Sequence, residues 1–332
     1  MNNKKSDLAV LGSGSWATAL VKLFSTNAER ISWYIRENDV IDHILTYKHN
    51  PRYLSTVDLD TRKLVLSSDI NEAVNQADIL VFVIPAAFLK DSLKDLRTDI
   101  SNKLVCSAIK GIVPQDNSIA GDFFSEKLNV PYNNLVILSG PSHAEEIAME
   151  KLTYLTIASL EKKNAERLSL LLKNHYLKTI ISDDIKGTEY AAVIKNIYAI
   201  AAGIANGLGF GDNFQAVLLS NAATEMKRFI KAVFKNDRDI NSSPYLGDLL
   251  VTAYSKFSRN RMFGQMIGRG YSLRSTLMEM EMVAEGYYAA NCINEINRRL
   301  KVSIPIADTV YRILYQKANP ETEFDELTEL LK

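Results

Sequence analysis

The chain has 332 residues, and its 39 basic and 39 acidic residues give a formal net charge of zero. A hydrophobic content of 47% and a charged content of 23% are typical of a globular protein, and the length favours about two domains. Because there is no excess of positive charge, the composition excludes the usual signal for binding nucleic acid or an anionic membrane surface.

Cysteine usage and the start of the chain predict the compartment. Cys106 and Cys292 are far apart in the sequence, which excludes a disulfide framework and a zinc-binding spacing and favours a reducing cytoplasm. The start, MNNKKSDLAV, is too polar for a signal peptide, and no apolar run approaches membrane-spanning length. The four histidines are scattered and predict no metal site. We therefore expect a cytoplasmic protein with no integral membrane segment.

The first half of the chain alternates short β-rich runs with helical stretches such as 70–78 and 87–96. Continuous apolar strands that alternate with helices favour a doubly wound, mostly parallel sheet of the α/β class. The expected strands are 8–11, 31–35, 64–66, 79–84, 104–108, 135–138, 153–159 and 179–182.

The second half has a different pattern. From about Lys186 the periodicity is that of long helices, with few β-rich runs and with glycine clusters at the expected helix ends. We therefore expect a boundary near residue 187, between an α/β domain at 1–187 and an all-helical domain at 188–332.

A glycine-rich turn follows the first expected strand. The segment from Gly12 to Ala17, GSGSWA, has the pattern G-x-G-x-x-A and opens a helix. Gly12 permits the tight turn, Gly14 lets the backbone approach a pyrophosphate, and Ala17 is small enough for helix and strand to pack. A turn without a ligand is the alternative, but the strand–turn–helix context favours a dinucleotide site.

The second expected strand ends at Arg36, where the adenosine ribose of a dinucleotide lies in this kind of fold. An arginine there can accommodate a 2′-phosphate, so it favours NADP(H) over NAD(H). The adjacent Glu37 leaves open a second interpretation, in which the two side chains form a solvated surface ion pair.

Polar residues follow two later strands, at the sheet edge where open α/β folds bind ligands. Lys110 follows the strand 104–108, although a surface lysine is an equal alternative. Gly140-Pro141-Ser142-His143-Ala144-Glu145 follows the strand 135–138. There Ser142 and Glu145 have the spacing of a helix capping box, with backbone N–H groups nearby for a ligand.

A lysine interrupts the apolar stretch 190–207, YAAVIKNIYAIAAGIANG. On a helix, bulky residues such as Ile194 and Ile197 form a packing face, and small alanines surround Lys195. Burial lowers the pKa of a lysine and suits it to act as a base near neutral pH. The alternative is a lysine that reaches solvent or pairs with a carboxylate such as Asp248.

The segment Ser258-Arg259-Asn260-Arg261 combines an expected N-cap, two arginines and an amide. A helix N-terminus and a guanidinium group both match the oxygens of a phosphate. A solvated basic helix start is the alternative. The segment therefore predicts a phosphate site.

Seven separated motifs together resemble the bacterial NAD(P)-dependent glycerol-3-phosphate dehydrogenase family over nearly the whole chain. They are GSGSWATAL at 12–20, IKG at 109–111, SGPSHAEE at 139–146, KNIYAIAAGIANGLGFGDN at 195–213, LGDL at 246–249, SRNRMFG at 258–264 and MVAEG at 282–286. The resemblance implies a Rossmann-type domain followed by an all-α domain, often in a homodimer. It also implies reversible reduction of dihydroxyacetone phosphate to sn-glycerol 3-phosphate, which supplies glycerophospholipid synthesis.

The resemblance also implies a role for each matched residue. Lys195 takes the place of the family's proton acceptor, with Lys110 polarising the substrate oxygen and Asp248 orienting the lysine or a hydroxyl. Besides Gly12 and Gly14, the expected dinucleotide contacts are Ser15, Trp16, Arg36, Lys110, Ala144, Arg259, Val283 and Glu285. The expected substrate contacts are Lys110, Gly140, Ser142, Lys195, Asp248, Ser258, Arg259 and Asn260.

The chain departs from the family pattern in three places. Ala191-Ala192 stands where a pair of glycines commonly precedes the lysine, and Ser243-Pro244-Tyr245-Leu246 replaces a glycine-rich approach to G-D-L. Ala253-Tyr254-Ser255 replaces a more typical Thr-Cys before S-R-N-R. We expect these changes to affect local packing and kinetics rather than any proposed chemical role.

Two other classes of function stay open at this point. One is another dehydrogenase of a phosphorylated or carboxylated small molecule on the same two-domain plan, such as a hydroxyacid or ketopantoate-type reductase. The other is a dinucleotide sensor without catalysis. The two arginines of S-R-N-R favour a phosphorylated substrate, and the joint presence of Lys110, Lys195 and Asp248 favours an enzyme.

Overall fold

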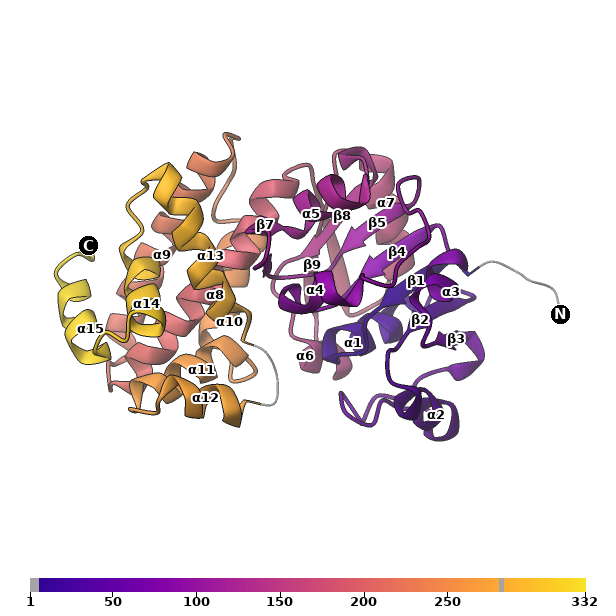
Figure 1. Ribbon diagram of the computed structural model, residues 1–332, viewed down its shortest axis with the longest axis horizontal. Helices are drawn as coiled ribbons and strands as arrows, with labels where there is room; N and C mark the ends of the chain where they lie inside the picture. Colours follow the sequence, from indigo (N-terminus) through magenta and orange to yellow (C-terminus); the bar gives the residue numbers. More distant parts are fainter. Residues whose placement is uncertain (1–5, 281–283) are drawn as a thin grey trace. The chain divides into compact units, whose positions relative to one another are not determined.

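The computed structural model describes residues 6–280 and 284–332. Contacts divide the chain into two units, which are described separately (Figure 1). The first contains the chain up to Ile109 together with Ala120–Ile185, and the second contains Lys110–Ile119 and Lys186–Lys332. The short segment 110–119 therefore belongs to the second unit, although it lies within the sequence of the first. The periodicity of the sequence does not predict this assignment.

The first unit is built on an eight-stranded sheet with the order β10-β9-β8-β5-β4-β1-β2-β3. All neighbouring strands are parallel except β8 and β9, which are antiparallel. The predicted mostly parallel, doubly wound sheet is therefore confirmed. The strands are β1 (Leu8–Leu11), β2 (Ile31–Tyr34), β3 (Leu64–Ser67), β4 (Ile79–Phe82), β5 (Leu104–Ser107), β8 (Leu135–Ser139), β9 (Thr153–Ala158) and β10 (Leu177–Ser182).

Helices cover both faces of this sheet, as its buried, apolar strands require. On one face, alternate strand residues pack in one core with α1 (Ser15–Phe24), α2 (Asn38–Tyr47), α6 (Ala144–Ala148) and α7 (Lys162–Leu172). On the other face, the ring of Phe82 lies 4.6 Å from that of Phe124 in α5 (Ala120–Leu128). The remaining helices of this unit are α3 (Ile70–Asn75), which contacts β1–β3, and α4 (Ala86–Ser92).

Among its described residues, the second unit consists of helices and loops apart from the hairpin of β6 (Ile112–Val113) and β7 (Ser118–Ile119). Its central helix is α8 (Ile185–Gly207), in which every residue from Tyr190 to Ala205 is buried. Both predicted faces of this helix are therefore covered, not only the bulky one. The other helices are α9 (Asp212–Val233), α10 (Asp248–Tyr254), α11 (Arg259–Gly268), α12 (Leu273–Glu279), α13 (Glu285–Leu300), α14 (Pro305–Tyr315) and α15 (Pro320–Thr328).

Glycines let α8 and α11 approach until their backbones touch. A Cβ added at Gly203 of α8 would lie 2.1 Å from the carbonyl oxygen of Arg261, and one added at Gly264 of α11 would lie 2.1 Å from that of Ile200. Real Cβ atoms do not come this close to backbone, so only glycine fits at either position. This contact fixes the start of α11 against the middle of α8.

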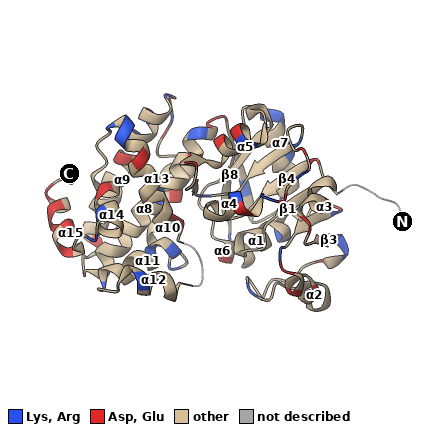
Figure 2. Ribbon diagram, in the orientation of Figure 1, with Lys and Arg blue, Asp and Glu red and all other residues tan. Residues whose placement is uncertain are grey.

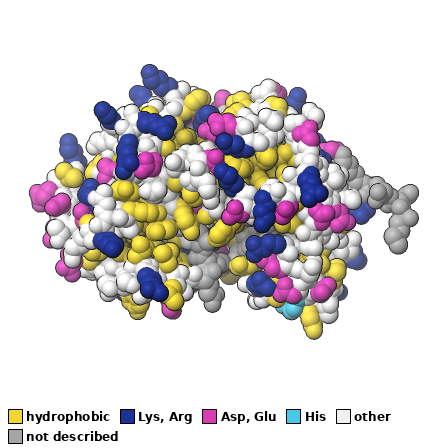
Figure 3. All heavy atoms as spheres, in the orientation of Figure 1, with side chains coloured by type: hydrophobic (Ala, Val, Ile, Leu, Met, Phe, Trp, Pro, Cys, Tyr) yellow, Lys and Arg dark blue, Asp and Glu magenta, His cyan; other side chains and the backbone are white. Residues whose placement is uncertain are grey.

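Acidic and basic residues are interspersed over the ribbons of both units (Figure 2). On the face shown in Figure 3, they alternate with hydrophobic and neutral side chains.

Both cysteines, Cys106 and Cys292, are buried and free. Among the described residues, no helix combines the length and apolar character needed to cross a membrane. Within the same residues, no cluster of three or more His, Cys, Asp or Glu side chains is arranged to hold a metal ion.

Candidate active site

Lys195 lies in the middle of α8 and is 3% exposed, as its apolar neighbours predict. Its ammonium donates hydrogen bonds to Oδ1 of Asp248 at 2.5 Å and to Oγ1 of Thr252 at 2.9 Å. Asp248 and Thr252 are one turn apart on α10, so both face the lysine. The sequence predicted either a buried lysine or one paired with Asp248, and the structure shows both features at once.

The surroundings of Lys195 shift its pKa in opposite directions. Burial lowers the pKa of Lys195 to about 8, and the nearby ammonium of Lys110 lowers it as well, whereas Asp248 raises it. Nζ of Lys110 lies 3.5 Å from Oδ2 of Asp248, so one buried carboxylate lies between two ammonium groups. Because burial is the largest influence, Lys195 can hold or release a proton near neutral pH.

A chain of amides links this cluster to neighbouring elements. Asn196 donates a hydrogen bond to the carbonyl oxygen of Lys110 at 2.8 Å and accepts one from Asn260 at 3.0 Å. Oδ1 of Asn260 in turn accepts the backbone N–H of Gly286 at 2.9 Å. These hydrogen bonds connect the segment before β6 with α8, α11 and the start of α13. They fix the orientations of the side-chain amides of Asn196 and Asn260.

The start of α11 has the predicted cap. Ser258 is the N-cap, and its side chain accepts the backbone N–H of Arg261 at 3.2 Å. Arg259 is partly exposed, and its side chain has no hydrogen bond or ion pair within residues 6–280 and 284–332. A guanidinium group without a carboxylate partner beside a helix N-terminus is suited to bind an anion.

The glycine-rich loop of the first unit joins β1 to α1, as predicted. Gly12 has φ +125°, and an added Cβ would lie 2.7 Å from the carbonyl oxygen of Val83, so this position requires glycine. At Gly14, the N-cap of α1, no described atom lies within 4 Å of an added Cβ. Ser15 and Trp16 form the first turn of α1. The open space over Gly14 at a helix N-terminus therefore fits a pyrophosphate.

Two side chains hold this loop in place. Nε1 of Trp33 in β2 donates to the carbonyl oxygen of Gly12 at 2.7 Å. The fully buried Asn50 donates to the carbonyl oxygen of Ser13 and to the hydroxyl of Thr18, both at 3.0 Å. Sequence reasoning missed Asn50, because an asparagine far along the chain carries no local signal of this contact.

Arg36 lies two residues beyond the end of β2. Its side chain is 78% exposed and pairs with Glu37 at 2.8 Å. The adjacent glutamate hydrogen bonds to the guanidinium and raises the pKa of Arg36. The surface ion pair that the sequence left open is therefore present, on a side chain that is also free to reorient because it is exposed.

The predicted capping box after β8 is wrong. The N-cap of α6 is His143, and the hydroxyl of Ser142 instead donates to the carbonyl oxygen of Gly140 at 3.0 Å. Gly140 has φ +105°, and α6 starts one residue later than the capping box predicts. Gly140, Ser142 and Ala144 nevertheless lie at the carboxyl end of β8, where the strand pattern predicted them.

The structure thus joins several predicted residues by direct contact within the second unit, namely Lys110, Lys195, Asp248 and, through Asn196, Asn260. Glu285 is the first residue of α13, next to Gly286, whereas Val283 lies outside the described residues. Sequence reasoning missed Thr252 and the role of Asn196. A signal existed for both, because Thr252 is four residues after Asp248 and Asn196 adjoins Lys195.

Two family models together match nearly the whole chain. Residues 7–165 match the family described as NAD-dependent glycerol-3-phosphate dehydrogenase N-terminus, and residues 184–325 match its C-terminus. The chain belongs to the NAD-dependent glycerol-3-phosphate dehydrogenase family. This result confirms the resemblance that the seven motifs carried.

Full-length members of the family cover nearly the whole chain. A glycerol-3-phosphate dehydrogenase (NAD(P)+) of Limosilactobacillus reuteri (strain DSM 20016) is 34% identical over 97% of this chain and 96% of its own length. One from Clostridium botulinum (strain Eklund 17B / Type B) is 31% identical over 97% of each chain. The crystal structure of glycerol-3-phosphate dehydrogenase from Coxiella burnetii has a TM-score of 0.90 at 27% identity, and covers 98% of this chain and 99% of that one.

Proposed function

We propose that this chain reversibly reduces dihydroxyacetone phosphate to sn-glycerol 3-phosphate, with the hydride exchanged with NAD(P)H. The observation that carries the proposal is the buried ammonium of Lys195, which donates to Asp248 and Thr252, while Lys110 lies at the other oxygen of Asp248. A lysine with a purely structural role would need only one carboxylate to stabilise its charged form. Here burial and the second ammonium, that of Lys110, lower the pKa of Lys195 toward neutral pH.

Lys195 is the general acid and base in this proposal. In the reducing direction its Nζ gives a proton to the oxygen on the central carbon of the substrate, and in the oxidising direction it takes the proton back. Asp248 and Thr252 set the direction of Nζ, and Thr252 is itself held by the hydrogen bond that it donates to the carbonyl oxygen of Asp248 at 2.6 Å. Lys110 stabilises negative charge on the same substrate oxygen.

The phosphate of the substrate is bound at the start of α11. Arg259 supplies a guanidinium fork, Ser258 and Asn260 supply polar side chains, and the helix N-terminus favours an anion. Gly140 and Ser142 are proposed as further substrate contacts from the family resemblance. Binding of the phosphate by the groups of α11 orients the central carbon of the substrate toward Lys195.

The dinucleotide is held by the loop Gly12–Trp16, with Lys110, Ala144, Arg259, Val283 and Glu285 as further proposed contacts. When bound, the nicotinamide supplies or accepts the hydride. The open space over Gly14 and the N-terminus of α1 support the placement of the pyrophosphate there.

We propose a preference for NADPH over NADH, because Arg36 can turn from Glu37 to a 2′-phosphate at little cost. Exposed ion pairs contribute about 0–1 kcal/mol, less than a new charge-assisted bond to phosphate. From the sequence pattern we also propose a cytoplasmic location and domains at 1–187 and 188–332. From the family resemblance we propose a homodimer, whose product supplies glycerophospholipid synthesis.

The test is oxidation of NADPH and of NADH with dihydroxyacetone phosphate by three forms of the protein. We expect Lys195→Ala to lower kcat about 10³-fold, in the range for loss of a general acid, with dinucleotide binding retained. We expect Arg36→Ala to raise KM for NADPH selectively. Lys231→Ala, at an exposed lysine of α9, is the matched control and should leave all constants unchanged.

Two outcomes would overturn these assignments separately. Near-normal turnover by Lys195→Ala would remove the lysine from the chemistry. Equal effects of Arg36→Ala on NADH and NADPH would remove the arginine from cofactor choice. Dinucleotide binding without turnover in the wild type would indicate a sensor or a dehydrogenase of another substrate.

A further inference from the structure

A groove with a volume of about 680 Å³ lies within the second unit, between α9 and the segment 240–254. Its floor includes small side chains of α9, and its apolar lining includes Leu219, Leu250 and Tyr254. This volume is within the usual range of small-molecule sites. None of the residues proposed for the chemistry lines this groove.

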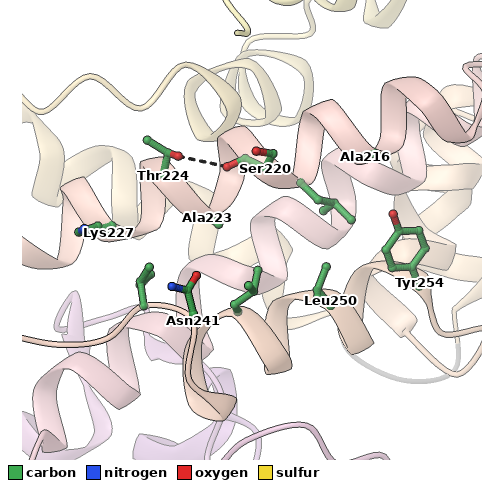
Figure 4. A pocket seen from close by; sticks show the side chains of 11 residues that line it. Ala216, Ser220, Ala223, Thr224, Lys227, Asn241, Leu250 and Tyr254 are labelled. Atoms are coloured by element: carbon green, nitrogen blue, oxygen red, sulfur yellow. Dashed lines mark hydrogen bonds between the residues drawn. The ribbon is translucent and has the colours of Figure 1, made fainter.

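Polar and apolar side chains are both spread along the length of the groove (Figure 4). Thr224, Lys227 and Asn241 lie toward one end, and Ala216, Leu250 and Tyr254 lie toward the other. Residues 216 and 227 are eleven positions apart on α9, which corresponds to about 16 Å along the helix axis. The groove is therefore elongated and amphipathic.

The end of the groove at Lys227 is positively charged. Lys227 is exposed, and within the described residues it forms no ion pair. No acidic residue of the described chain lines the groove. A ligand with an acidic head would satisfy this lysine, whereas a cationic head would be repelled by it.

The groove lies against the outer face of the helix that orients Lys195. On α10, Asp248 and Thr252 are four residues apart and face the lysine, while Leu250 and Tyr254 are four residues apart and line the groove. An offset of two residues places the second pair on the opposite side of the helix. A ligand in the groove therefore contacts α10 on the side opposite to Asp248 and Thr252, which bind the ammonium of Lys195.

Two departures from the family pattern contribute to this groove. Leu246, of the segment SPYL, and Tyr254, of AYS, are both lining residues. Neither residue has a role in the proposed chemistry. The groove is thus formed in part by segments in which the sequence departs from the family pattern.

We propose that the groove is an effector site for an amphipathic carboxylate with an unbranched tail of about ten carbons, and that its occupation inhibits the enzyme. An extended hydrocarbon chain advances about 1.2 Å per bond, so such a ligand is about 12 Å long, shorter than the about 16 Å that residues 216–227 span along α9. The carboxylate binds Lys227, and the tail packs on Leu219, Leu250 and Tyr254.

Inhibition follows from the contacts of Lys195. Asp248 and Thr252 lie at 2.5 Å and 2.9 Å from its ammonium, so a ligand that displaces α10 changes both hydrogen bonds and the direction of Nζ. A misdirected ammonium lowers kcat, while the phosphate site on α11 keeps its substrate affinity. This effect on turnover rests on the function proposed for Lys195, but binding in the groove does not.

Binding is tested by calorimetric titration of the full chain with decanoate below its micelle concentration. Decyltrimethylammonium, which has the same tail and a cationic head, is the matched ligand. We expect one decanoate site per chain and at least tenfold weaker binding in Lys227→Gln, the loss typical of a charge-assisted contact. Lys231→Gln is the control, and Ala223→Phe, which fills the groove, should abolish binding.

The proposal is overturned if decanoate does not bind, if decyltrimethylammonium binds equally well, or if the two lysine variants lose affinity equally. In the kinetic arm, saturating decanoate should lower kcat with KM for dihydroxyacetone phosphate unchanged, and Lys227→Gln should resist this effect. Binding without a change in kcat overturns the inhibition. If the protein had no dehydrogenase activity, calorimetry would still decide the site, so the two proposals fail separately.

Discussion

The ammonium of Lys195 lies 2.5 Å from Oδ1 of Asp248, and the side chains of the two residues are 4% and 1% exposed. Lys110 lies 3.5 Å from the other oxygen of the same carboxylate. Two cations thus share one anion in a site that excludes most water. The excess positive charge and burial both favour the neutral form of a lysine, and this relationship makes the site testable by pH.

The pH dependence of the two reaction directions should be opposite. The pKa of Lys195 is lowered to about 8, mainly by burial. Reduction needs the protonated lysine, so kcat/KM for dihydroxyacetone phosphate should fall tenfold per pH unit above about pH 8. Oxidation of sn-glycerol 3-phosphate needs the neutral lysine and should rise to a plateau above the same pH. Initial rates from pH 6 to 10 test this, and parallel profiles in both directions would contradict it.

Neighbouring charges should move this midpoint in opposite directions. Lys110 lowers the pKa of Lys195 and Asp248 raises it. The midpoint should therefore shift to higher pH in Lys110→Gln and to lower pH in Asp248→Asn, even though both variants are slower than wild type. The readout is the midpoint of the kcat/KM profile, because a merely structural defect would lower the rate without moving it.

Close packing of α8 and α11 should make Gly264 intolerant of any side chain. The added Cβ of Gly264→Ala would lie 2.1 Å from the carbonyl oxygen of Ile200, so the helices must separate. We expect a loss of about 3 kcal/mol in the free energy of unfolding, together with a raised KM because Arg259 moves with α11. Urea unfolding measures this loss. Gly211→Ala, where no described atom lies within 4 Å, is the control and should cost about 1 kcal/mol or less.

A buried carboxylate away from the site should make stability depend on pH. Glu225 of α9 accepts the backbone N–H groups of Ile306 and Ala307 at the start of α14, both at 3.0 Å. Burial nevertheless raises its pKa to about 7 from an ordinary value of 4.5. The folded state therefore binds this proton more tightly than the unfolded state, and the free energy of unfolding should fall as pH rises through this window.

The size of that effect can be isolated with Glu225→Gln. Relative to this variant, the wild type should lose stability by up to about 3 kcal/mol between pH 4.5 and pH 7.5. Urea unfolding at both pH values tests the sign. A wild type that gains stability over this interval relative to Glu225→Gln would show that the two backbone N–H bonds outweigh burial.

The local sequence pattern was sufficient to predict the strands, the helices and several residues of the candidate site. Alternation of apolar strands with helices predicts the parallel sheet, because a sheet covered on both faces needs strands that are apolar throughout. The turn at Gly12 and the cap at Ser258 are also local, since each depends on the conformation or hydrogen bonds of three or four consecutive residues. The capping box predicted at Ser142 is wrong, since α6 has His143 as its N-cap.

Tertiary structure decided how Lys195 is held, although the sequence already offered Asp248 as a carboxylate partner. The apolar sequence of α8 predicts that the lysine is buried, but Asp248, Thr252 and Lys110 reach it from distant parts of the chain. The contact of Asn50 with the glycine-rich loop and the inclusion of residues 110–119 in the second unit are likewise long-range. Periodicity reports which side of an element is buried, whereas the pKa of a buried group depends on partners that only the folded chain brings together.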